Sequence, residues 1–383
     1  MNLPPNPVMQ TPIQTLIQTR LRQDIQSMQG YAIQDSRGMV KLDAMENPHQ
    51  LSPELQAQLG QRLGALALNR YPNARVDELR HALASYAGMP DGCDIMLGNG
   101  SDELISLVSM AIDLPSAQNP SGKAPVILAP EPGFVMYAMS AQFQGLHFVG
   151  VPLTPDFELD EAAMLDAIRL HQPALVYLAY PNNPTANLWS EASIEKIIAL
   201  QGQQGGLVVM DEAYQPFAAK SWIDAIRQQP EQHAHVLLMR TMSKFGLAGV
   251  RIGYMIGVKA LIGEINKLRP PYNISVLNYE CALFALEHAD VFKRQATDLI
   301  QERGLLLNAL RVLPGVTCWN SDANMILVRV PDAAKAFEGM KSRGVLIKNV
   351  SKMHPLLANC LRLTVGTAAE NTQMLAALEQ SIS

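Results

Sequence analysis

Lys244 stands in the stretch TMSKFGLAGVRIGY, directly after the apolar run HVLLM. Such a run predicts a buried strand. A charged amine at its end is costly to remove from water unless it is paired with another group or takes part in binding or catalysis. Thr241 and Ser243 precede Lys244, and Arg251 follows it. A desolvated lysine can form a Schiff base with an aldehyde, while serine and arginine can bind a phosphate. The stretch could therefore serve a ligand that carries both groups.

Polar residues also follow three other apolar runs. Asp211 and Tyr214 come after GLVVM, and an acid at the end of a buried strand is expensive to ionise unless it faces a cation. Asn183 follows ALVYLAY, and Ser101 and Asp102 open an apolar-periodic helix after DIML and two glycines. The alternatives are a helix cap or ion pair at the acid, a tight turn at the asparagine, and an ordinary capped helix. The glycines lack the GxGxxG spacing of dinucleotide-binding sites.

Pyridoxal 5′-phosphate (PLP) is a cofactor that needs an amine, a phosphate cradle and a carboxylate together. It carries an aldehyde, a phosphate and a basic ring nitrogen, and its protonated ring acts as an electron sink. Lys244 could bind the aldehyde, and Asp211 could keep the ring nitrogen protonated. Ser243 and Arg251, with the helix N-terminus at Ser101, could hold the phosphate. In combination, these motifs predict a PLP site.

Alternating strands and helices must position these residues. The strand candidates are APVILAP, HFVGVPL, ALVYLAY, GLVVM, HVLLM and GYMIG, and helical patterns such as DELISLVSMAI, DEAAMLDAIRL and EASIEKIIALQ fall between several of them. Short, nearly continuous apolar strands separated by helices predict an α/β fold, with a mostly parallel sheet covered on both faces. Ligands of such sheets bind at the carboxyl ends of the strands, which is where the candidate residues stand.

The chain is expected to have three parts. Residues 1–40 look like an N-terminal arm that packs on the small domain or on a partner, and residues 41–270 form the large PLP-binding domain. The sequence pattern changes after residue 270, and residues 271–383 are expected to form a smaller α+β domain. It contains one long helical stretch, LNYECALFALEHADVFKRQATDLIQERGLLLNALRVL, then the strand candidates NMILVRV, GVLIKNV and CLRLTVG and a final helix AENTQMLAALEQSI.

The composition bounds the function. The chain has 383 residues, of which 48% are hydrophobic, and a net charge of −5, so a nucleic-acid partner is not expected. Four scattered cysteines favour reduced thiols in the cytoplasm. We expect no secretory signal and no membrane-spanning segment. His233 and His235 lack a third ligand, so no metal site is expected.

The chain resembles the fold-type I PLP-dependent aminotransferases, and among them most closely the histidinol-phosphate aminotransferases. The resemblance covers nearly the whole length and rests on GMVKLDAMENP, RYPNA, GNGSDE, PGFVMY, YPNNPT, VVMDEAY, RTMSKFGLAGVRIGY and CLRLTVGT. It implies a transaminase of histidine biosynthesis. The implied reaction converts histidinol phosphate and 2-oxoglutarate into imidazole-acetol phosphate and glutamate.

The resemblance also implies roles for single residues. Lys244 would carry the cofactor as a Schiff base and, once displaced by substrate, move the proton. Asp211 would pair with the ring nitrogen, while Asn183 and Tyr214 would bond the ring hydroxyl. Phe134 stands where the family stacks an aromatic ring on the cofactor face, and this apolar contact does not need a hydroxyl. The residues implied at the phosphate are Ser101, Asp102, Thr241, Ser243 and Arg251.

Other matches concern the substrate and a second subunit. Tyr71, in RYP, matches a tyrosine that reaches into the partner's site, so the implied active unit is a homodimer. Arg362 matches an arginine that clamps a substrate anion, where bidentate geometry favours arginine over lysine. Tyr31 matches a substrate-contacting tyrosine of the arm. Lys348 stands where an arginine often faces the substrate phosphate, and a lysine binds phosphate as a point charge.

The chain also departs from the family near residue 43, and other functions on the same fold stay open. Asp43 and Met45 replace two asparagines of the usual LNxNENP. An aromatic amino acid aminotransferase and a phosphothreonine-type decarboxylase are alternatives on the same fold, because the bond that breaks depends on its orientation to the ring. A PLP-binding regulator without turnover is a further alternative. Such regulators carry a DNA-binding helix-turn-helix domain first, and only about 40 residues precede the matching part here.

Overall fold

The computed structural model describes residues 12–28, 34–72, 75–113 and 124–382. The chain divides into two compact units, Met1–Arg37 and Gly38–Ser383. In the first unit, α1 (Pro12–Arg20) and α2 (Gln23–Gln26) fall within the predicted arm. Tyr31, implied at the substrate, lies outside the described residues.

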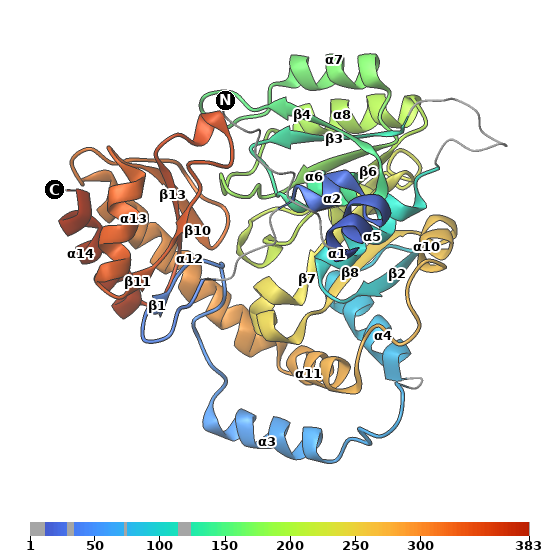
Figure 1. Ribbon diagram of the computed structural model, residues 1–383. Coiled ribbons are helices and arrows are strands. Elements are labelled where there is room, and N and C mark those ends of the chain that lie inside the picture. Colours follow the sequence, from blue (N-terminus) through green and yellow to red (C-terminus); the bar gives the residue numbers. More distant parts are fainter. Residues whose placement is uncertain (1–11, 29–33, 73–74, 114–123, 383) are drawn as a thin grey trace. The chain divides into compact units, whose positions relative to one another are not determined.

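The second unit contains a large sheet whose strands follow the order β2-β8-β7-β6-β5-β3-β4 (Figure 1). They are β2 (Cys93–Gly98), β3 (Val126–Glu131), β4 (His147–Pro152), β5 (Leu175–Ala179), β6 (Leu207–Asp211), β7 (Val236–Thr241) and β8 (Gly253–Val258). In this described part, β8 runs antiparallel to both neighbours and the other pairs are parallel. The predicted α/β fold with a mostly parallel sheet is confirmed, and each strand lies at an apolar run.

One face of the large sheet is covered by α5 (Ser101–Ala111), α6 (Met136–Gln144) and α10 (Lys259–Asn266). Tyr177 and Val209 point into the buried core on this side. Successive side chains of a strand point to opposite faces, so the next residue of β6 on this side is Asp211. The sheet therefore presents this acid toward α5 and α6, at its carboxyl edge.

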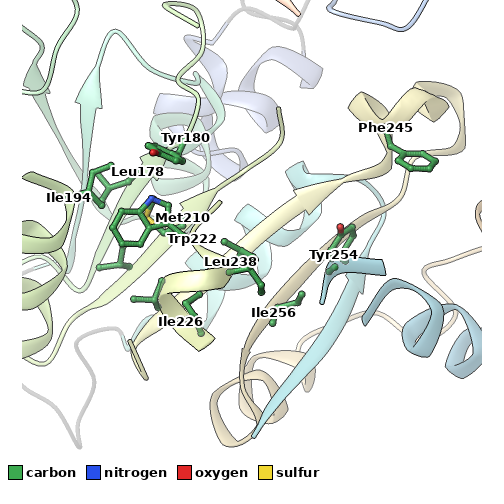
Figure 2. Packing of buried hydrophobic residues seen from close by; sticks show 14 of the residues in the cluster. Leu178, Tyr180, Ile194, Met210, Trp222, Ile226, Leu238, Phe245, Tyr254 and Ile256 are labelled. Atoms are coloured by element: carbon green, nitrogen blue, oxygen red, sulfur yellow. The ribbon is translucent and has the colours of Figure 1, made fainter. Parts of the chain in front are cut away.

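The opposite face is covered by α4 (Arg75–Ala87), α7 (Glu161–His171), α8 (Glu191–Gln203) and α9 (Ile223–Gln228). Figure 2 shows Leu178, Met210 and Leu238 in this core with Ile194 of α8 and Trp222. Burial on both faces explains why the strands are apolar at nearly every position.

Local sequence signals set the helix starts. Asp160 and Ser190 precede α7 and α8, and each side chain accepts a hydrogen bond from a backbone N–H of the first turn. Before residue 289, the other helical elements of the second unit are α3 (Pro53–Gly64), η1 (Gln215–Phe217), η2 (Ser243–Leu247), η3 (Ala248–Val250) and α11 (Val276–Glu287).

A second, antiparallel sheet has the strand order β12-β13-β10-β9. Figure 1 labels its two central strands, β13 and β10. Its strands are β9 (Thr317–Cys318), β10 (Met325–Arg329), β12 (Lys348–Asn349) and β13 (Cys360–Thr364). It shares a core with α12 (Ala289–Arg311), α13 (Ala333–Ser342) and α14 (Ala368–Ile382), and η4 (Pro355–Leu357) lies just before β13. A separate parallel pair joins β1 (Val40–Lys41) to β11 (Val345–Leu346), and Leu42 belongs to the same core.

The structure differs from the sequence prediction in two places. The helical stretch predicted over 277–313 is two helices, because His288, with φ −110° and ψ 29°, interrupts it between α11 and α12. The strand candidate GVLIKNV is divided into β11 and β12, which pair with β1 and β13 in different sheets.

Two further features concern only the part of the chain that the structure describes. In that part of the chain, the helices are not long and apolar enough to cross a membrane. Among the same residues, no group of three His, Cys, Asp or Glu side chains is placed to hold a metal ion. The predicted domain boundary near residue 270 stays a prediction.

Candidate active site

A pocket opens at the carboxyl ends of the parallel strands. The predicted residues that line it are Ser101, Asp102, Phe134, Asn183, Asp211, Tyr214, Thr241, Ser243, Lys244 and Arg251. Met45, Tyr137, Ala179, Pro181 and Ala213 line it as well. The strand ends therefore bring together side chains that are more than 100 positions apart in the sequence, as expected for a ligand site of such a sheet.

Lys244 lies in η2, directly after β7, and its side chain enters the pocket. Its Nζ donates a 2.8 Å hydrogen bond to the main-chain oxygen of Ala44 and lies 5.7 Å from the ring centre of Tyr214. Burial lowers the pKa of Lys244 to about 7, and the positive charge of Arg362 acts in the same direction while Glu46 opposes it. An amine with this pKa is partly unprotonated at neutral pH, as a nucleophile or a base requires.

Asp211, at the end of β6, is a buried carboxylate. Burial raises its pKa to about 6, and two hydrogen bonds act against the rise. The hydroxyl of Tyr137 donates to Oδ2 at 2.6 Å, and the Ala213 N–H donates to Oδ1 at 3.0 Å. Both of these hydrogen-bond donors are neutral, so the buried carboxylate is suited to bind a cationic group of a ligand.

Tyr137 lines the pocket but was not among the residues predicted from the sequence. It lies in the first turn of α6, three positions after Phe134, and its N–H donates to the Phe134 carbonyl. The two rings meet edge to face, with centroids 5.7 Å apart. Residues three apart on a helical turn share a side, so this spacing is the signal that could have indicated Tyr137.

An anion cradle lies at the N-terminus of α5. The first N–H groups of a helix have no intrahelical partner, and here Gly100 supplies no side-chain cap. Arg251 Nη1 lies 3.4 Å from Ser243 Oγ, and Arg251 Nη2 lies 3.3 Å from Asp102 Oδ2. The Thr241 hydroxyl donates to Ser243 Oγ at 3.1 Å. This arrangement of N–H groups, hydroxyls and a guanidinium can bind a phosphate.

Arg362 connects the second sheet to the pocket. It is buried on β13, where Nη1 donates to Asn183 Oδ1 at 2.8 Å and Nη2 donates to the main-chain oxygen of Asp43 at 2.8 Å. Lys348 pairs with Arg362 in the register of β12 and β13. The structure therefore places the two candidate anion-binding residues opposite each other on neighbouring strands, and neither is among the residues that line the pocket.

Met45 lines the pocket in a backbone conformation that is unusual for its residue type. Its φ is 52°, a left-handed value that asparagine tolerates better than methionine. Its N–H donates to Thr364 Oγ1 and its carbonyl accepts from Asn324 Nδ2, both at 3.1 Å. These bonds to Thr364 on β13 and to Asn324, just before β10, hold the backbone in place despite the conformational cost.

Tyr71 is not among the residues that line the pocket of its own chain. Its side chain is 77% exposed and stacks on Tyr272, with ring centroids 4.7 Å apart. Tyr272 is itself 57% exposed. The two rings thus form an aromatic pair on the surface, and the role implied for Tyr71 in a second subunit stays a prediction.

The fold and the pocket agree with the comparisons to known proteins. Residues 37–378 match the family model of the class I and II aminotransferases. The chain belongs to that family. The predicted resemblance and transaminase class are thereby confirmed.

This aminotransferase has similar relatives with curated names. Over 362 residues it is 70% identical to the histidinol-phosphate aminotransferase of Polaromonas naphthalenivorans, a match that covers 94% of this chain and 96% of that protein. It is 65% identical to the enzyme of the same name from Acidovorax ebreus, covering 95% and 97% of the two chains.

Among solved structures, the aminotransferase resembles the histidinol-phosphate aminotransferase of Sinorhizobium meliloti in complex with pyridoxal-5′-phosphate. The TM-score is 0.79, and the match covers 95% of this chain and 98% of that one. The identity is 22%, so this likeness shows the shared fold.

Proposed function

We propose that this aminotransferase uses PLP to transfer the amino group of histidinol phosphate to 2-oxoglutarate. The observation that carries the proposal is one pocket that combines the Lys244 amine, the buried Asp211 carboxylate and the anion cradle at Ser101. The 70% identity to a histidinol-phosphate aminotransferase supports this substrate over the alternatives on the same fold.

The pocket fits PLP group by group. When bound, PLP supplies an electron sink for the bond that breaks at the substrate carbon. Lys244 would hold its aldehyde carbon, and Ser243 and Arg251, with the first N–H groups of α5, would hold its phosphate. The surroundings of Asp211 support this fit, because its carboxylate is buried and its hydrogen-bond donors are neutral. A protonated ring nitrogen would supply the missing positive charge.

Single residues of the pocket would move the proton, bond the ring hydroxyl and pack on the ring. The Nζ of Lys244 would take a proton from the substrate carbon and return it, for which a pKa of about 7 is suitable. Asn183 and Tyr214 would hydrogen-bond the ring hydroxyl. Burial raises the pKa of Tyr214, so this phenol stays protonated as a donor. Phe134 would pack on the ring face, and the buried walls would exclude water.

Substrate and partner contacts follow the resemblance. Arg362 would bind a substrate anion, and Lys348, on the neighbouring strand, would face the substrate phosphate. Tyr31 would contact substrate from the arm. Tyr71 would reach the site of a second copy, which makes the active unit a homodimer. We place the enzyme in the cytoplasm.

A spectroscopic half-reaction tests the function. The visible absorbance band of the PLP-loaded enzyme should disappear on addition of L-histidinol phosphate and return with 2-oxoglutarate. Lys244→Ala should show neither change at a useful rate. If L-phenylalanine removes the band and histidinol phosphate does not, the aromatic alternative replaces the proposal. Carbon dioxide released from phosphothreonine would favour the decarboxylase.

A further inference from the structure

Tyr137 contacts the pocket carboxylate from the side of α6. Its 2.6 Å hydrogen bond to Asp211 Oδ2 joins two side chains that are 2% and 5% exposed. A hydrogen bond to a charged acceptor is stronger than a neutral one, and it strengthens further where water is excluded. With the Ala213 N–H on Oδ1, each carboxylate oxygen has one fixed donor. Each oxygen also keeps acceptor capacity for a ligand.

The phenol of Tyr137 is itself held in place by aromatic neighbours. It stacks on Tyr177 with centroids 4.3 Å apart and an angle of 6° between the rings, and it meets Phe134 edge to face. Burial, together with the charge of Asp211, raises the pKa of Tyr137 well above its ordinary value. The hydroxyl therefore stays protonated and can act only as a donor to the carboxylate.

The charge state of Asp211 depends on this donor. Burial favours the neutral acid, and the nearby carboxylates Asp102 and Glu212 act in the same direction. The Tyr137 hydroxyl and the Ala213 N–H oppose them. Without the hydroxyl, more of the acid would be neutral, and a neutral carboxyl pairs poorly with a protonated ring nitrogen.

We propose, resting on the function above, that Tyr137 is a positioning residue for the cofactor ring. By bonding Oδ2 of Asp211, it keeps the carboxylate ionised and in one orientation. The carboxylate in turn keeps the ring nitrogen protonated. Through Asp211, Tyr137 thus affects the protonation of the ring nitrogen, on which the electron-accepting capacity of the ring depends.

Tyr137→Phe tests the proposal, since it removes the hydroxyl and keeps the ring between Tyr177 and Phe134. Tyr177→Phe is the matched control: this tyrosine is buried in the same stack, and its hydroxyl donates to the Ile105 carbonyl at 3.4 Å and not to Asp211. Two quantities would be measured on the full-length protein. One is the dissociation constant for PLP, and the other is the ¹⁵N shift of the ring nitrogen in enzyme loaded with ¹⁵N-labelled PLP.

We expect Tyr137→Phe to weaken PLP binding by about tenfold and to move the ring-nitrogen shift toward the unprotonated value. It should lower kcat more than it changes KM for histidinol phosphate. Tyr177→Phe should change neither the PLP affinity nor the shift, even where both variants lose similar thermal stability. Equal behaviour of the two variants in both measurements would overturn the proposal.

Asp211→Asn separates this inference from the proposed function. If that variant loses the protonated ring nitrogen while Tyr137→Phe retains it, Tyr137 has no positioning role and the proposed function stands. If Asp211→Asn also leaves the shift and the PLP affinity unchanged, the role given to Asp211 is wrong. The inference about Tyr137 then fails with it.

Discussion

The Nζ of Lys244 lies 2.8 Å from the main-chain oxygen of Ala44, a residue 200 positions earlier in the sequence. Main-chain groups of residues 43–45 also bond to Arg362 and Thr364 on β13. This short segment therefore links the amine at the end of β7 to the second sheet. The segment also supplies the pocket residue Met45, so the second sheet contacts the pocket through it.

The lowered pKa of Lys244 predicts a pH-dependent stability. In the cofactor-free protein its pKa is about 7, against 10.5 for the ordinary side chain. Between these values the unfolded state binds a proton that the folded state does not, so stability rises with pH. The slope that Lys244 contributes is at most about 1.4 kcal/mol per pH unit. Lys244→Met should lose this slope, as measured by urea unfolding between about pH 7 and 9.

Lys267→Met is the control for that comparison. Lys267 is exposed and paired with Glu264 on α10, so its removal should leave the pH dependence of stability unchanged. A free energy difference between wild type and Lys244→Met that stays flat over this range would contradict the buried, partly neutral amine.

Gly100 is expected to control the anion cradle through its close approach to Arg251. Its φ is 79°, and a Cβ added there would lie 2.6 Å from Arg251 Nη2. Because that atom is the end of a flexible side chain, the substitution should move the Arg251 side chain away from Ser243 and leave the protein folded. Gly100→Ala should therefore weaken PLP binding by about tenfold or more, measured by titration of the cofactor-free protein.

Gly92 provides a matched control for Gly100 at the other end of β2. Its φ is 78°, and an added Cβ would meet no atom within 4 Å. Both alanine variants should lose about 1 kcal/mol of stability from the left-handed backbone conformation. Gly92→Ala should bind PLP normally, and an equal loss of PLP affinity in both variants would refute the role given to Arg251.

A buried carboxylate joins three helices of the second unit. Glu280 of α11 accepts hydrogen bonds from Arg62 of α3 and Arg75 of α4, and its side chain is 3% exposed. Glu280→Gln would leave the two arginines without their shared charge. We expect it to reduce the free energy of unfolding by about 2 kcal/mol, measured in urea.

Asp290→Asn is the comparison for the buried carboxylate. Asp290 pairs with Arg294 one turn along α12, and both side chains are about two-thirds exposed, at 66% and 67%. Exposed pairs of this kind contribute little, so the substitution should produce no measurable change. If it destabilised the protein as much as Glu280→Gln, burial would not be the reason for the effect.

Arg362 is expected to act on substrate binding through its two-pronged geometry. Its two terminal nitrogens bond to Asn183 and to the Asp43 carbonyl, and a lysine could not reach both. Arg362→Lys should raise KM for histidinol phosphate by about tenfold or more and change PLP affinity less. Steady-state kinetics and a PLP titration measure the two effects.

Arg329→Lys controls for the loss of a guanidinium in the same sheet. Arg329, on β10, also bonds to main-chain oxygens, those of Ala358 and Leu356, away from the pocket. It should leave KM unchanged. A similar rise in KM for both variants would indicate a general effect on the second sheet and would remove the case for Arg362 as an anion-binding residue.

The sequence by itself determined the strands of the large sheet and the residues at their ends. Apolar runs mark strands that are buried on both faces, and this pattern is local, so it can be detected without knowing which strands pair. Asp211, Asn183 and Lys244 could be placed in one pocket for the same reason, because parallel strands bring their carboxyl ends to one edge. The roles of these residues, like those of Tyr71 and Tyr31, stay predictions.

Only the tertiary structure decided which side chains touch. The bond from Tyr137 to Asp211 spans 74 positions and the bond from Arg362 to Asn183 spans 179. Such contacts depend on how helices pack on a sheet and how two sheets meet, which no local pattern records. The division of residues 344–350 into two strands has the same cause. Their pairing partners lie about 300 positions before them at β1 and just after them at β13, and the backbone hydrogen bonds to those partners decide where each strand ends.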